Sequence, residues 1–299
     1  GSSQTENVST SGNYSVTVTD GNGCTAEDNM NLTVNPAPTP NIGADQTVCD
    51  YNTPVTLDAG AGYSNYSWSS GGSSQTENVS TSGNYSVTVT DGNGCTAEDN
   101  MNLTVNPAPT PNIGADQTVC DYNTPVTLDA GLYSSYNWSN GDVTQTTNVS
   151  TSGNYSVTVT DGNGCTAEDN MNLTVNPAPT PNIGADQTVC DYNTPVTLDA
   201  GAGYSNYSWN SGGSSQTENV STSGNYSVTV TDGNGCTAED NMNLTVNPAP
   251  TPNIGADQTV CDYNTPVTLD AGAGYSNYSW SSGGSSQTEN VSTSGNYSV

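Results

Sequence analysis

Apolar and polar residues alternate along most of this 299-residue chain. Alternation with a period of two is typical of strands that bury one face against a core and leave the other in water. Within one stretch of about 70 residues, the pattern predicts a first strand that contains Ile42 and Val48. A weaker pattern predicts another strand at Gln75–Ser80, which carries Val79. Every second residue is apolar in four clearer segments: Val55–Ala59, Tyr66–Trp68, Tyr85–Val89 and Met101–Val105.

Turn-forming residues separate these segments. The strongest signal is Asp91-Gly-Asn-Gly94, because Asp-Gly and Asn-Gly accept the positive φ angles of a tight hairpin. Six or seven short alternating strands predict an antiparallel β-sandwich. Trp68 on the third main strand, and Tyr85 placed as a tyrosine corner before the sixth, make that sandwich immunoglobulin-like. The sheet to which Gln75–Ser80 belongs is not determined by the pattern.

The sequence repeats itself. The stretch Asp45–Gly60 recurs from Asp116, Asp186 and Asp257, and residues 1–35 duplicate 72–106. This period indicates a tandem array, and we expect the chain to be a window of a longer one. The predicted division is a partial repeat at 1–35, full immunoglobulin-like repeats at 36–106, 107–176 and 177–247, and a partial repeat at 248–299 that lacks its last strand.

Short proline-rich segments lie between the repeats. Asn35-Pro-Ala-Pro-Thr-Pro40 recurs at 106–111, 176–181 and 247–252. Three prolines in six residues favour extended polyproline II, so we expect linkers that space the domains and limit their angles. The fold class predicted is therefore all-β, a tandem array of immunoglobulin-like sandwiches joined by short proline-rich linkers. The expected core aromatics are Trp68, Tyr85, Trp138, Tyr155, Trp209 and Tyr226.

The charge composition removes several classes of function. The chain has 29 Asp and Glu and no Lys, Arg or His, which gives a formal charge of −29. It therefore has no cation to neutralise phosphates, which excludes nucleic-acid binding and attachment to anionic lipid through a basic patch. Without imidazole or lysine there is no Ser–His triad, Cys–His pair or Schiff base. Since every repeat offers nearly the same residues, we predict that the chain is not an enzyme.

Two cysteines occur in each full repeat and one in each partial repeat. No C-x-x-C pair and no His is present, which argues against a metal site and leaves structural disulfides. Disulfides indicate an oxidising, extracellular setting. Pairing across the linkers, as in Cys24–Cys49, is one alternative, although such a bridge must reach over the prolines. The preferred pairing is within repeats: Cys49–Cys95, Cys120–Cys165 and Cys190–Cys236.

Two further sets of residues are candidate sites. Asp91, Asn93, Glu98 and Asp99, with their equivalents in each repeat, offer enough oxygen atoms for weak calcium binding. The alternative is that they form turns and solvated surface, and the spacing does not match an EF-hand loop. Tyr51 and Tyr63 lie in turns and form either a platform for sugar rings or caps on the ends of a small core.

The order and spacing of five motifs resemble the immunoglobulin-like or PKD-like repeats of giant cell-surface adhesins of Bacteroidota, of the gliding-adhesin type exported by the type IX route. The motifs are Asp45–Cys49, Val55–Gly60, Tyr66–Ser69, Gly83–Asp91 and Asn93–Cys95. The resemblance implies a cell-surface stalk or filament, with neighbouring repeats, other copies of itself and surface glycans as partners. The alternative function is a glycan-binding array that uses the turn tyrosines.

Overall fold

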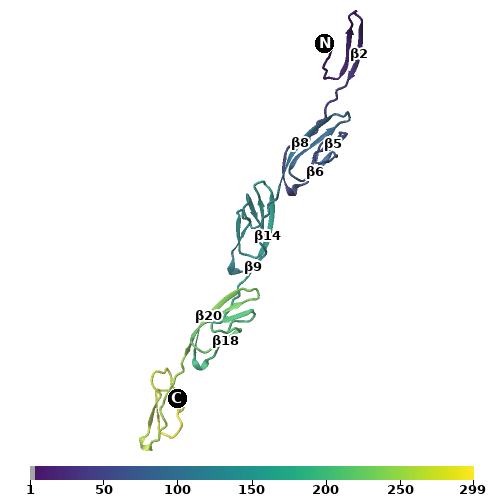
Figure 1. The fold of residues 1–299 in the computed structure, drawn as a ribbon. Coiled ribbons are helices and arrows are strands. Elements are labelled where there is room, and N and C mark those ends of the chain that lie inside the picture. Colours follow the sequence, from purple (N-terminus) through teal and green to yellow (C-terminus); the bar gives the residue numbers. More distant parts are fainter. Residues whose placement is uncertain (1–3) are drawn as a thin grey trace. The chain divides into compact units, whose positions relative to one another are not determined.

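The computed structural model describes residues 4–299 (Figure 1). By their contacts these residues form two compact units, one containing residues up to Gln117 together with Pro125–Thr174, the other containing Thr118–Thr124 together with Val175–Val299. Each unit holds antiparallel sandwiches built from the same short strands. The prediction of an all-β tandem array of immunoglobulin-like sandwiches is confirmed. The predicted boundaries of five domains stay a prediction.

The first complete repeat shows how one sandwich is built. Its six strands are β3 (Gln46–Cys49), β4 (Val55–Asp58), β5 (Asn65–Trp68), β6 (Thr76–Val79), β7 (Gly83–Thr90) and β8 (Thr96–Asn106). One sheet has the order β3-β8-β7-β5 and the other consists of β4 and β6. The segment Gln75–Ser80, unassigned from sequence, therefore belongs to the smaller sheet as β6. All pairs are antiparallel except β3 with β8, which run parallel.

The other repeats reuse these elements. The middle repeat contains β9 (Gln117–Cys120), β10 (Val126–Asp129), β11 (Ser135–Trp138), β12 (Thr146–Val149), β13 (Gly153–Thr160) and β14 (Thr166–Asn176). The next contains β15 (Gln187–Cys190), β16 (Val196–Asp199), β17 (Asn206–Trp209), β18 (Thr217–Val220), β19 (Gly224–Thr231) and β20 (Thr237–Asn247). The partial repeats contain β1 (Gly12–Thr19) with β2 (Thr25–Leu32) at one end and β21 (Val267–Asp270) with β22 (Thr288–Val291) at the other.

Each core forms where the alternating apolar residues of the two sheets meet. Trp68 is 4% exposed, and its indole Nε1 donates to the Ser74 carbonyl at 2.7 Å, so the one polar atom of the ring is satisfied. Around it lie the buried side chains of one contiguous cluster: Ile42, Leu57, Ala59, Val79, Val87, Val89, Met101 and Leu103. Trp138 and Trp209 are equally buried in their repeats.

The tyrosine corner is formed as the fold class requires. The Tyr85 hydroxyl donates to the Thr81 carbonyl at 2.8 Å, while the ring is half-buried against the core. This bond fixes the turn that enters β7 and so sets the register of Val87 and Val89. Tyr155 and Tyr226 make the same bond to Thr151 and Thr222.

One loop shows two coupled sequence changes between repeats. In the first complete repeat Ser70 Oγ donates to Glu77 Oε1, and a Cβ on Gly72 would lie 2.1 Å from Glu77 Oε2. In the middle repeat the equivalents of Gly72 and Glu77 are Asp142 and Thr147, and the Thr147 hydroxyl donates to the Asp142 carboxylate. The carboxylate lies on β6 in the first complete repeat and in the preceding loop in the middle repeat, while the polar contact between loop and strand remains.

We therefore expect Gly72→Asp alone to destabilise its repeat by about 1 kcal/mol, since it displaces the Glu77 carboxylate from Ser70 and places two negative charges together. Gly72→Asp with Glu77→Thr should recover most of that loss. A urea-unfolding double-mutant cycle measures the coupling. Equal losses in the single and double variants would contradict it.

In three repeats the segment that follows the prolines is held by hydrogen bonds from backbone amides to carboxylates. The Ile42 amide donates to Asp99 Oδ2 at 2.8 Å, and the Asn102 amide donates to Asp45 Oδ1 at 2.8 Å. The same pairs recur as Ile113 with Asp169 and Ile183 with Asp240. Each linker is thus held against the last strand of the repeat that it enters, and the carboxylate oxygens are used for that purpose.

Candidate functional site

The two disulfides are the clearest site that the fold creates. Cys49 is bonded to Cys165 and Cys120 is bonded to Cys236, each pair 116 residues apart in sequence with Cα atoms 5.7 Å apart. Both the preferred pairing within repeats, Cys49–Cys95, Cys120–Cys165 and Cys190–Cys236, and the alternative pairing across linkers are therefore wrong. The first cysteine of a repeat is joined to the second cysteine of the next repeat.

Strand register explains why pairing within a repeat fails. Cys49 ends β3 and lies opposite Asn106, the last residue of β8, because the two strands run parallel. Cys95 immediately precedes Thr96, the first residue of β8. At about 3.3 Å per residue, the eleven residues of β8 separate the two cysteines by roughly 35 Å. A disulfide needs Cα atoms within about 7 Å, so the two cysteines cannot meet.

A short turn places the first cysteine. Cys49 is followed by the 3-10 turn η1 (Asp50–Asn52), in which the Thr53 amide and hydroxyl both donate to the Asp50 carbonyl. The equivalent turns are η2 (Asp121–Asn123), η3 (Asp191–Asn193) and η4 (Asp262–Asn264). These three-residue turns are the helical segments of residues 4–299, and none has the length or hydropathy to span a bilayer.

A hairpin places the second cysteine. Asp161 Oδ1 accepts the amides of Asn163 at 2.8 Å and Cys165 at 2.9 Å, so one carboxylate closes the Asp-Gly-Asn-Gly turn. Cys165 is fully buried at this position. In the first complete repeat, the hydrogen bond from the Cys95 amide and then that from the Asn93 amide hold the pKa of Asp91 below its usual range.

A tyrosine accompanies each disulfide. The Tyr51 hydroxyl accepts the Thr166 amide at 3.2 Å and lies 3.4 Å from the Thr166 hydroxyl. Tyr122 makes the same two contacts with Thr237. We name the group formed by Cys49, Tyr51, Cys165 and Thr166 the junction, and the same name applies to Cys120, Tyr122, Cys236 and Thr237.

The junction changes the interpretation of the turn tyrosines. Tyr51 remains 52% exposed, but its hydroxyl is bonded to Thr166. Tyr63 is half-buried, packs against the core and meets Tyr66 edge to face at 5.9 Å between ring centroids. The Tyr51 hydroxyl is therefore used in joining repeats and the Tyr63 ring in capping a core, while the platform for sugar rings stays a prediction.

The predicted calcium ligands are not brought together. Asp91 Oδ1 is occupied by the amides of its own turn, and Asp99 Oδ2 by the Ile42 amide. Glu98 and Asp99 are adjacent on β8, so their side chains leave opposite faces of the sheet. Among residues 4–299 no three Asp, Glu or Cys side chains are grouped as a metal site.

Four cysteines of the described chain are unpaired: Cys24, Cys95, Cys190 and Cys261. Positions 116 residues after Cys190 and Cys261, or before Cys24 and Cys95, lie outside the 299-residue sequence. The side-chain hydrogen bond that the Tyr192 hydroxyl makes to the Cys190 sulfur, and then the charge of the Cys190 thiolate, raise the pKa of Tyr192.

The pH dependence of stability follows from a second set of carboxylates. The side-chain amide of Gln75 and then the amide of Gly60 hold the pKa of Asp58 below its usual range. A depressed pKa in the folded state contributes stability above the unfolded value of 3.8, and this contribution is lost as the pH falls through the folded pKa. The same bonds lower the pKa of Asp129, Asp199 and Asp270.

At roughly 0.5 M salt, repulsion between carboxylates is screened. Under these conditions we expect the midpoint temperature of unfolding to stay constant from pH 7 to 5 and to decrease once the pH is below 3.8. Changing Asp58 and its three equivalents to Asn keeps the acceptor oxygen and should make the fall shallower. Thermal unfolding across this range measures it. A variant that follows the same pH curve as the original chain would contradict the assignment.

Comparisons with known proteins give distant likenesses. No protein-family model matches this chain, and no curated protein matches it. Similar solved structures include immunoglobulin domains 1–5 of Sidekick-1, with 16% identity over 80% of this chain and 67% of that one and a TM-score of 0.26. The titin fragment I67–I69 has 12% identity over 68% and 96%, with a TM-score of 0.35.

A bacterial structure is also similar, a Ca²⁺-stabilised adhesin that helps an Antarctic bacterium reach out and bind ice. It has 17% identity over 80% of this chain and 82% of that one, with a TM-score of 0.28. At these identities and TM-scores the likenesses carry no conclusion about function, and the fold rests on the sheets and cores described above.

Proposed function

We propose that this chain is a structural segment of an extracellular bacterial surface adhesin, in which it forms part of a stiff stalk or filament and performs no catalysis. The observation that carries the proposal is the disulfide between consecutive repeats. Cys49–Cys165 adds a second covalent connection to a junction that the proline-rich linker already spans. Two connections restrict bending and rotation more than the proline-rich linker does alone.

The chemistry of the chain supports the same function. Disulfides form and persist in oxidising surroundings outside the cytosol. The charge of −29 without any cation keeps chains apart at low salt and favours extension. The motifs Val55–Gly60 and Gly83–Asp91 resemble those of gliding adhesins of Bacteroidota. On the strength of this resemblance we propose further that the stalk serves gliding motility.

Electron microscopy of single chains tests the proposal. We expect extended, beaded particles that bend little when oxidised and bend more after reduction. The matched control is a chain with Cys49→Ser and Cys120→Ser, which should bend as the reduced chain does, with or without reductant. Compact particles, or the same bending in oxidised and reduced chains, would contradict the stalk.

A further inference from the structure

The two disulfides create a covalent route through the complete repeats that is much shorter than the backbone. This first route runs through residues 42–49, which include β3, and crosses from Cys49 to Cys165. It continues through β14, the following linker and β15, which ends at Cys190. From Cys49 to Cys190 the route contains 25 backbone steps beside the disulfide, whereas the backbone itself contains 141.

A second route is built in the same way from other residues. From Cys95 the backbone passes through β8, a linker and β9 to Cys120. The disulfide of Cys120 then leads to Cys236, which immediately precedes β20. This second route also contains 25 backbone steps, against 141 along the backbone from Cys95 to Cys236. The two routes have no residue in common.

The strands between the two cysteines of a complete repeat lie on neither route. In the first complete repeat these strands are β4, β5, β6 and β7, within residues 50–94. The equivalent segments are 121–164 and 191–235, and we name the three the side segments. A side segment supplies Trp68 and Tyr85, or their equivalents, to its core. It therefore completes the sandwich without forming part of either covalent route.

The two routes lie side by side in the first and third complete repeats. β3 of the first route pairs in parallel with β8 of the second, and β15 pairs in the same way with β20. Carboxylates join the routes as well, because the Ile42 amide donates to Asp99 and the Asn102 amide donates to Asp45. The equivalent bonds recur in the third complete repeat. Hydrogen bonds thus connect two chains of covalent bonds that are otherwise separate.

We propose that this chain is a cut-tolerant tether, whose parts stay covalently joined after a peptide bond has been broken at any one position between Cys49 and Cys236. A cut between Cys49 and Cys165 is bridged by the first disulfide. A cut between Cys120 and Cys236 is bridged by the second, and the two stretches overlap. The proposal goes beyond the stalk function, since it applies to a flexible chain as well as to a stiff one.

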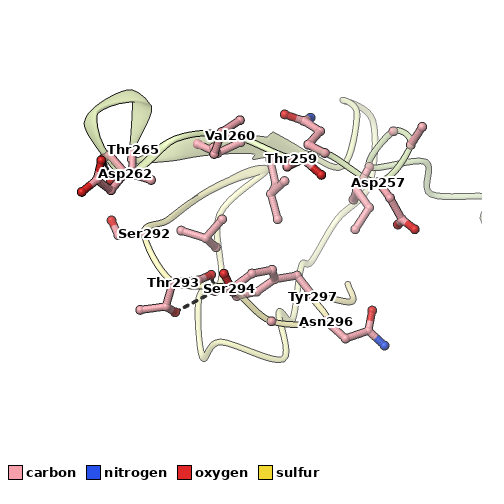
Figure 2. Close-up of a pocket in the computed structure, with 18 residues that line it drawn as sticks. Asp257, Thr259, Val260, Asp262, Thr265, Ser292, Thr293, Ser294, Asn296 and Tyr297 are labelled. Atoms are coloured by element: carbon pink, nitrogen blue, oxygen red, sulfur yellow. Dashed lines mark hydrogen bonds between the residues drawn. The ribbon is translucent and has the colours of Figure 1, made fainter.

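Local contacts hold a side segment in place after a cut. Exposed loop tips are the preferred sites of proteolytic cleavage. In the first side segment β4 pairs with β6, and Trp68 Nε1 donates to the Ser74 carbonyl. The tyrosine corner fixes the entry to β7. Figure 2 shows the equivalent bond in residues 248–299, where the Tyr297 hydroxyl donates to the Thr293 carbonyl. A cut at a loop tip removes none of these contacts.

Trypsin tests the proposal, because it cuts after Lys or Arg and the original chain has neither. Ala61→Lys, Leu132→Lys and Ala202→Lys each place one site in an exposed loop of a side segment. Oxidised chains are treated with iodoacetamide to block thiols, cut in urea and run on denaturing gels. Each single-site chain should keep its original mass without reductant and yield two fragments with it. Two separate fragments without reductant would overturn the proposal.

The matched control for these single cuts removes both disulfides. Leu132→Lys with Cys49→Ser and Cys120→Ser should separate into two fragments after trypsin, with or without reductant, because no bond then bridges the cut. A control chain that keeps its original mass without reductant would show that other bonds join the parts, and would also overturn the proposal.

The chain with all three sites separates the two routes. On denaturing gels without reductant it should give two species, residues 1–61 joined to 133–202 and residues 62–132 joined to 203–299. One species would indicate bonds within repeats and four fragments bonds across linkers, and either result would overturn the proposal. In native buffer the two species should elute as one particle from a size-exclusion column, because paired strands connect the routes. Two particles in native buffer would contradict the side-by-side arrangement.

Discussion

Stretched between Cys49 and Cys236, the oxidised chain is expected to extend to about a quarter of the length that the reduced chain reaches. The backbone between these residues spans 187 steps, which corresponds to about 650 Å when fully extended at roughly 3.5 Å per residue. With both disulfides intact the shortest covalent route runs from Cys49 to Cys165, back to Cys120 and across to Cys236. That route contains 45 backbone steps, or about 160 Å.

Optical-tweezers extension of a chain with handles outside these residues measures the difference before and after reductant. Cys49→Ser should lengthen the oxidised route to 71 steps, since only Cys120–Cys236 then remains between the two ends. Cys190→Ser is the matched control and should change nothing, because Cys190 is unpaired. A longer route in the Cys190→Ser chain would indicate bonds within repeats instead.

The second large effect concerns the core. Trp68→Ala is expected to destabilise its repeat by about 3–5 kcal/mol, because it leaves a cavity among Leu57, Val87 and Met101 and also removes the bond to the Ser74 carbonyl. A sandwich of about 70 residues has little stability to lose, so that repeat should unfold at moderate temperature.

Calorimetry of the reduced chain separates this repeat from the others, since reduction removes the covalent links between them. Leu132→Ala is the matched control, because Leu132 is 86% exposed in a loop and should change the unfolding midpoint by little. If Trp68→Ala and Leu132→Ala shift the midpoint equally, the indole does not hold the core together.

Alternation alone predicted much of the fold. The period of two placed Val87, Val89 and Met101 on the buried face, and these positions are fully buried. Such patterns are readable because each strand must bury one face wherever it lies. The alternating pattern does not show which two strands pair with each other. For this reason β6 could be assigned to the sheet of β4 only from the structure.

The disulfide pairing of the junction could not be predicted from the sequence for a related reason. Cys49 and Cys95 are close in sequence, but the parallel pairing of β3 with β8 places them at opposite ends of one sandwich. The residues of a short edge strand alternate in the same way whether the strand pairs in parallel or antiparallel. The alternating pattern therefore does not show that β3 runs parallel to β8. Likewise the carboxylate of Asp99 suggested a cation, whereas its partner is the Ile42 amide, 57 residues away.

The central claim is that consecutive repeats are bonded to each other, and chains with only two cysteines test it most directly. Peptide mapping of the original chain cannot distinguish the pairings, because the segments around equivalent cysteines are identical in every repeat. We therefore retain two cysteines and change the other six to serine. After oxidation and removal of the oxidant, titration should find no thiols in the chain that retains Cys49 and Cys165, and two in the chain that retains Cys49 and Cys95. The reverse result would contradict the account.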